Sequence, residues 1–101
     1  MDRFAILALL NARPGKEDEV EEFLKSAQPL VEEETGTTSW YAIKIGPASF
    51  GIFDTFVDEE GRTAHVSGAV AKALFARAEE LFATAPQIEM ASILASKTPN
   101  D

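Results

Sequence analysis

The stretch RFAILALLNA, residues 3–12, decides the fold, because as a β-strand it is apolar on both faces. Successive side chains of a strand point to opposite faces of a sheet. One face carries Phe4, Ile6, Ala8 and Leu10, and the other carries Ala5, Leu7 and Leu9. Two helices cover only one sheet face, so we expect a second copy of the chain to cover the other by sheet-to-sheet packing, as a homodimer. The alternative is a small sheet with a few exposed aliphatic side chains.

The following residues predict a helix and then a β-hairpin. From Lys16 onward apolar residues recur at helical spacing, and Pro29 should kink the last turns or end the helix near Gln28. Two β-rich runs follow, TTSWYAIKI (residues 37–45) and SFGIFDTFV (residues 49–57). The Gly46–Pro47–Ala48 turn between them is typical of a hairpin.

The last third of the chain predicts a second helical region and a final strand. Asp58 should cap a short helix over residues 59–66, and Ser67 should cap a longer one after a bend at Gly68. Pro86 should end that helix, and QIEMASILAS, residues 87–96, reads as a strand. The β-α-β-β-α-β order predicts one α+β domain over residues 1–101, with a ferredoxin-like antiparallel sheet whose first and third strands are central.

Composition excludes several classes of function. The net charge of −8 argues against nucleic-acid binding, and the acidic runs KEDEVEE, VEEE and VDEE are typical of solvated helix surface. The absence of cysteine excludes disulfides and thiolate metal sites, and one histidine cannot build a zinc centre. There is no glycine-rich phosphate loop or nucleophile elbow. With no basic leader and no span-length apolar run, we expect a cytoplasmic protein without a membrane partner.

Asp54 and His65 are the candidate catalytic pair. Asp54 falls in the middle of an apolar strand face, where a carboxylate is costly to bury without a partner. His65 is the chain's single histidine, and its ordinary pKa lies near neutrality. Two ordinary roles remain open: Asp54 pairing with Arg62 or Lys44 at the sheet rim, and His65 contacting the last carbonyls of its helix.

The chain resembles the antibiotic biosynthesis monooxygenase family, in NARPGKEDEVEEFL (residues 11–24) and FDTFVDEEGRTAHVSGAVAKALF (residues 53–75). FDTF stands where the family often has Tyr-Glu-x-Trp, so Asp54 replaces a glutamate and Phe56 a tryptophan. His65 stands where a histidine often follows a short acidic helix. In the haem-degrading relatives the Asn, Trp and axial His would fall on Ala8, His65 and Phe75, and a phenylalanine supplies no haem ligand.

The resemblance implies a dimeric α/β barrel that oxygenates a quinol, anthrone or related apolar aromatic with O₂ and without metal, flavin or haem. His65 would be the general base or a hydrogen-bond partner of the substrate, and Asp54 would orient it. Trp40 and Tyr41 point to opposite faces, so only one can serve the pocket. The alternative is a non-catalytic dimeric module of this fold, of the stress-responsive type, that binds an apolar small molecule. Residues that would line the cavity, or simply form core, are Phe4, Ile6, Phe23, Trp40, Phe50, Ile52, Phe56, Leu74 and Phe75.

Overall fold

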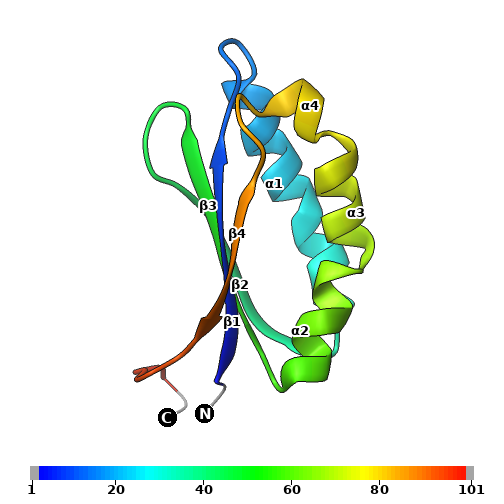
Figure 1. Ribbon diagram of the computed structural model, residues 1–101, viewed down its shortest axis with the longest axis vertical. Helices are drawn as coiled ribbons and strands as arrows, with labels where there is room; N and C mark the ends of the chain where they lie inside the picture. The colour runs from blue at the N-terminus through cyan, green and yellow to red at the C-terminus, as the bar shows by residue number, and fades with distance from the viewer. Residues whose placement is uncertain (1–2, 100–101) are drawn as a thin grey trace.

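The computed structural model describes residues 3–99, so the outermost ends of the predicted domain, residues 1–2 and 100–101, lie outside the described range. Figure 1 shows a sheet with its helices gathered on one side. The elements follow in the order β1 (Phe4–Asn11), α1 (Glu17–Glu32), β2 (Thr37–Lys44), β3 (Ser49–Phe56), α2 (Glu59–Val66), α3 (Ala69–Ala76), α4 (Ala78–Leu81) and β4 (Gln87–Ser92).

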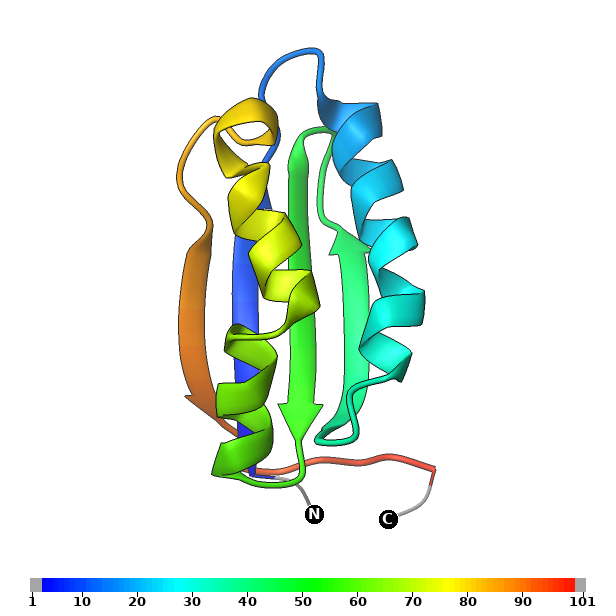
Figure 2. The same ribbon diagram turned by 90° about the vertical axis from the view of Figure 1, so that its right-hand side faces the viewer.

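The sheet has the predicted antiparallel, ferredoxin-like arrangement. Its strand order is β2-β3-β1-β4, which places β1 and β3 in the centre. In Figure 2 the helices lie in front of the sheet, and β4 lies at the edge beyond them. The core forms between this helix-covered face and the helices, and its largest fully buried side chains include Phe50, Phe56, Phe82 and Leu10. No helix within residues 3–99 is long and apolar enough to cross a membrane.

The opposite face of the sheet carries the apolar side chains that the sequence predicts for it. Leu7 pairs with Phe53, and Phe53 pairs with Tyr41, so these side chains form a row across the uncovered face. Phe53 is 36% exposed and Tyr41 60% exposed. Because successive residues alternate between faces, Trp40 points to the helix side and Tyr41 to the uncovered side.

Helix α1 excludes one of the two outcomes predicted for Pro29, an end near Gln28. It continues through Pro29 to Glu32. Pro29 lies in the last turns, so the missing backbone donor removes one bond near the end of the helix. Val31, two residues further, is buried with Ala27 and Val70 in a small apolar cluster. Burial of this turn offsets the lost hydrogen bond.

The second helical region differs from the prediction at Ser67. Asp58 does cap α2, accepting a 2.7 Å hydrogen bond from the backbone N–H of Gly61. Ser67, however, caps the end of α2 rather than starting α3: its hydroxyl donates to the carbonyls of Thr63 and Ala64. These carbonyls have no helical partner at a C-terminus, so the hydroxyl satisfies them.

The longer predicted helix is divided at Arg77, and the final strand is shorter than predicted. The division at Arg77 precedes Leu81, which is fully buried in the main core cluster. Strand β4 ends at Ser92 instead of residue 96. Ser92 pairs with Phe4, the first residue of β1, and the backbone N–H of Ile93 donates one more hydrogen bond, of 2.9 Å, to the carbonyl of Arg3 at the start of the described residues.

Candidate functional site

The site is built on one row of residues that crosses the sheet. Met90 of β4 pairs with Ile6 of β1, Ile6 pairs with Asp54 of β3, and Asp54 pairs with Trp40 of β2. All four side chains line one cavity on the helix side. Asp54 is 1% exposed, so a carboxylate lies fully within the core.

Asp54 faces His65, which is buried in the last turn of α2. The cap at Asp58 starts α2 directly after β3, and this brings the helix back over the strand. Nε2 of His65 lies 2.9 Å from Oδ2 of Asp54. The contact is an ion pair that does not meet hydrogen-bond criteria, and neither Asp54 oxygen has a hydrogen-bond partner within residues 3–99. The imidazole also lies near the ring of Phe56, and the two ring centroids are 5.3 Å apart.

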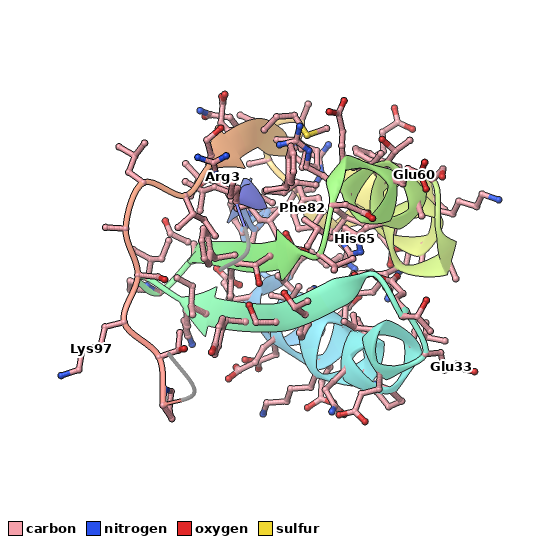
Figure 3. All side chains as sticks on the ribbon, turned by 90° about the horizontal axis from the view of Figure 1, so that it is seen from below. Arg3, Glu33, Glu60, His65, Phe82 and Lys97 are labelled. Carbon is pink, nitrogen blue, oxygen red and sulfur yellow. The ribbon has the colours of Figure 1, made fainter. Side chains whose placement is uncertain are left out.

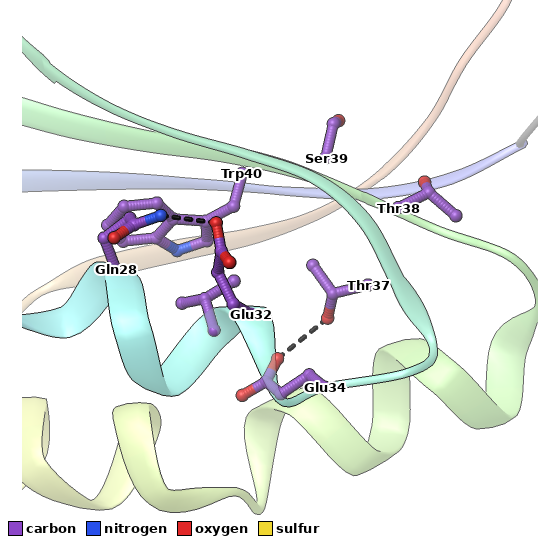
Figure 4. A pocket seen from close by; sticks show the side chains of 8 residues that line it. Gln28, Glu32, Glu34, Thr37, Thr38, Ser39 and Trp40 are labelled. Carbon is purple, nitrogen blue, oxygen red and sulfur yellow. Dashed lines mark hydrogen bonds between the residues drawn. The ribbon is translucent and has the colours of Figure 1, made fainter.

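A second carboxylate, which the sequence interpretation missed, holds the opposite nitrogen of the imidazole. Oε1 of Glu34, in the loop after α1, lies 2.6 Å from Nδ1 of His65. The same oxygen accepts a 2.8 Å hydrogen bond from the hydroxyl of Thr37, drawn as a dashed line in Figure 4. Figure 3 shows His65 between the sheet and the helices, whereas Glu33 and Glu60 lie at the periphery. His65 is thus held between two carboxylates.

Close backbone contact brings the Glu34 loop to α2. The carbonyl of Gly36 accepts a 3.0 Å hydrogen bond from Val57. A Cβ on Gly61 would lie 2.8 Å from that same carbonyl oxygen, and a Cβ on Gly36 would lie 2.7 Å from Cα of Gly61. Only glycine permits this approach at both positions, and the approach places Glu34 within reach of His65.

The two carboxylates decide the charge of His65. Burial by itself would lower the pKa of His65, but the contacts with Asp54 and Glu34 and their negative charges outweigh it, so the pKa is raised above its ordinary value. The protonated imidazole is therefore favoured more strongly here than in a free histidine. The structure does not show either of the two ordinary roles. Asp54 does not pair with Arg62, which donates to the Ala91 carbonyl, or with Lys44, which pairs with Glu21. The ring nitrogens of His65 face carboxylates instead of the last carbonyls of its helix.

The cavity beside this pair has a volume of about 200 Å³. Its wall is apolar apart from Asp54, His65 and the indole N–H of Trp40, which is buried without a hydrogen-bond partner within residues 3–99. The full lining is Ile6, Ala8, Trp40, Ile52, Asp54, His65, Val66, Val70, Ala71, Leu74, Phe75, Ile88 and Met90. On the far side of His65, an open polar cleft of about 480 Å³ includes Glu34 and Asp58.

Several of the expected lining residues lie elsewhere. Ile6, Trp40, Ile52, Leu74 and Phe75 line the cavity. The others lie outside it: Phe50 and Phe56 are in the core, Phe23 lies under Arg77, and Phe4 lies under Arg62. Ile88 and Met90 were missed, although their alternation in the last strand matches the helix-facing side of β1.

Groups of acidic and histidine side chains arranged to hold a metal ion are absent from residues 3–99. Asp54 and Glu34 contact opposite nitrogens of one ring, so they do not converge on a common point. What the arrangement can do is hold a proton on the imidazole and present a buried carboxylate to a ligand in the cavity.

Comparison with solved structures identifies a relative. A protein of unknown function from Nitrosomonas europaea is 47% identical, with a TM-score of 0.94, over 98% of this chain and 96% of that one. The chain belongs to the same family as this Nitrosomonas protein. Neither a protein-family model nor a curated protein matches the sequence.

More distant structures carry a functional name. A candidate antibiotic biosynthesis monooxygenase from Caulobacter crescentus is 18% identical, with a TM-score of 0.79, over 93% of this chain and 92% of that one. Another from Nitrosomonas europaea is 12% identical, with a TM-score of 0.81, over 91% of this chain and 99% of that one. The resemblance to the antibiotic biosynthesis monooxygenase family is thereby confirmed at the level of the fold.

The raised pKa predicts how the stability contributed by His65 depends on pH. A group whose folded-state pKa is raised stabilises the fold fully below its unfolded pKa, near 6.5, and loses this contribution as the pH rises through the folded-state value. The free energy of unfolding of the wild type should exceed that of His65→Gln by about 3 kcal/mol at pH 6. The difference should shrink toward pH 9. Chemical denaturation of both proteins at these pH values measures the difference. A difference that grows with pH would refute the stabilisation of protonated His65 by Asp54 and Glu34.

Proposed function

We propose that the chain is a cofactor-independent monooxygenase that oxidises a quinol, anthrone or related aromatic with O₂. The observation that carries the proposal is the buried Asp54 carboxylate, which lines an apolar cavity and keeps an oxygen without a hydrogen-bond partner within residues 3–99. Such an oxygen can accept the proton of an aromatic hydroxyl or of an activated C–H group. The names of the distant structures supply the class of reaction.

The reaction needs no further reductant. After losing its proton to Asp54, the substrate anion passes one electron to O₂, and the resulting radicals combine into a peroxide on the substrate carbon. For an activated CH₂ group, breaking the O–O bond and losing the second C–H proton gives a ketone and water: R₂CH₂ + O₂ → R₂C=O + H₂O. The substrate carbon supplies all four electrons, and the protein binds, orients and moves protons.

The roles of the predicted pair are exchanged relative to the sequence interpretation. His65 holds a proton between two carboxylates, so its nitrogens are poorly suited to accept another. Asp54 is the base in the proposal, and His65 positions it and stabilises its negative charge at 2.9 Å. The indole N–H of Trp40, on the residue directly opposite Asp54, is available to donate to a substrate oxygen.

Oxygen uptake tests the proposal. With menadiol or anthrone as probe, the purified protein should consume O₂ above the autoxidation blank, with or without EDTA. Asp54→Asn should lower turnover by roughly 10²–10⁴-fold, the usual contribution of a general base. Asp58→Asn makes the same chemical change outside the cavity and keeps a good helix cap, so it should retain wild-type turnover. Equal turnover from Asp54→Asn and Asp58→Asn, in folded proteins of similar melting temperature, would remove Asp54 from the chemistry.

The alternative function is a non-catalytic module that binds an apolar small molecule. The observation in its favour is that Glu34 and Asp54 occupy the two nitrogens of His65, so each of the two acid–base groups that line the cavity, Asp54 and His65, already has a charged partner. Binding of an aromatic probe without any oxygen uptake above the blank would favour this module.

We also propose that the uncovered face of the sheet is closed by a second copy of the chain. Tyr41, Ile43 and Phe53 lie exposed together there, and monomers rarely leave such a continuous apolar face open to water. Sheet-to-sheet packing would bury it in a homodimer.

Light scattering tests the assembly. The wild type should have the mass of two chains at micromolar concentration, and Phe53→Asp should shift it to one chain because an unpaired charge would enter the interface. Leu30→Asp, on the exposed side of α1, is the matched control and should remain dimeric. A wild type that stays monomeric would exclude this interface.

A further inference from the structure

The cavity has a polar inner end and an apolar opening. At the inner end lie Asp54, which is buried, and the N–H of Trp40. At the other end lie Phe75 of α3 and Met90 of β4, which line the cavity and are also 53% and 56% exposed. A cavity whose wall residues are half exposed reaches the surface between them, and Figure 2 shows that β4 extends beyond the cover of the helices. The opening is therefore at the β4 edge.

The row across the sheet gives the length of this passage. Asp54 and Met90 are separated by Ile6, two strand spacings apart, which is roughly 10 Å. The ionisable side chains of the lining are Asp54 and His65, and both lie at the inner end. A ligand that enters between Phe75 and Met90 meets apolar surface until it reaches Asp54.

The volume limits what the inner end can hold. A cavity of about 150 Å³ accommodates a benzene-sized ligand, and typical small-molecule pockets measure about 300–1,000 Å³. At about 200 Å³, this cavity has room for one hydroxyl-bearing ring and little more. The rest of a larger ligand must extend through the opening.

We propose that the site binds a phenol with an apolar tail. The phenol hydroxyl lies at Asp54, and the tail leaves the cavity between Phe75 and Met90. The tail would cover the two side chains that are otherwise left half exposed, and the flexible thioether of Met90 can adapt to tails of different shape. The assignment of the hydroxyl end rests on the proposed function, whereas the assignment of the tail rests on the shape of the cavity. Either of these two assignments can be wrong while the other is right.

A series of para-alkylated phenols tests the tail. Isothermal titration calorimetry should show binding of phenol, 4-propylphenol, 4-pentylphenol and 4-heptylphenol with a Kd that falls about two- to fourfold per added CH₂, since a fully buried CH₂ is worth about fourfold. The gain should level off once the tail passes Met90. The methyl ethers of the same compounds lack the hydroxyl proton and should bind more weakly at every length. Quenching of the fluorescence of Trp40, the chain's single tryptophan, gives an independent measurement of binding.

Matched variants separate this opening from unspecific hydrophobic binding. Phe75→Ser and Met90→Ser should flatten the dependence of Kd on tail length. Leu30→Ser removes an exposed apolar side chain away from the cavity and should keep the wild-type dependence. The inference is overturned if no phenol binds or if the three variants behave alike. It is also overturned if Kd is independent of tail length, which is the result expected if a second copy of the chain covers the opening. Tail-dependent binding without oxygen uptake would support this inference and refute the monooxygenase; oxygen uptake without tail dependence would do the reverse.

Discussion

The imidazole of His65, held between Asp54 and Glu34, is the interaction on which the rest of the site depends. It joins β3, α2 and the loop after α1, three parts of the chain that are distant in sequence. Asp54 is almost completely buried, and a buried carboxylate without a charged partner would be strongly destabilising. The histidine therefore makes it possible to place an acid in the core beside an apolar cavity.

The contact between Glu34 and His65 depends on the path of the neighbouring backbone. Glu34 reaches His65 because the loop and α2 touch at Gly36 and Gly61, where a side chain on either residue would collide with the other backbone. The same contact leaves a polar cleft on the outer side of His65 and an apolar cavity on the inner side. His65 thus lines both the open cleft and the apolar cavity.

The sequence predicted the fold well because the relevant signals are local and periodic. The apolar runs in residues 3–12 and 49–57, together with the β-α-β-β-α-β order, identified the two central strands, and the turn at Gly46–Pro47–Ala48 identified the hairpin. The errors arose where tertiary packing overrides a local rule. Burial of Val31 carries α1 past Pro29, and the start of β1 at Phe4 limits the length of β4.

The candidate pair was likewise found from the sequence, because an acid on an apolar strand face and a single histidine are both unusual. Glu34 was missed because it belongs to a run of acids at the end of a helix, where most members face solvent. Which acid turns inward depends on the path of the loop, and that path is set by the Gly36–Gly61 contact. No period in the sequence encodes such a contact.

NMR titration of the ring protons of His65 measures whether Asp54 and Glu34 favour the protonated imidazole inside the fold. We expect an apparent pKa above about 6.5, the ordinary value, in the wild type. Glu34→Gln should lower this pKa, because one negative partner is removed, while Glu33→Gln, a neighbouring change without contact to the ring, should leave it unchanged. A wild-type pKa at or below the ordinary value, or equal pKa values in the two variants, would show that the two carboxylates do not stabilise the imidazolium.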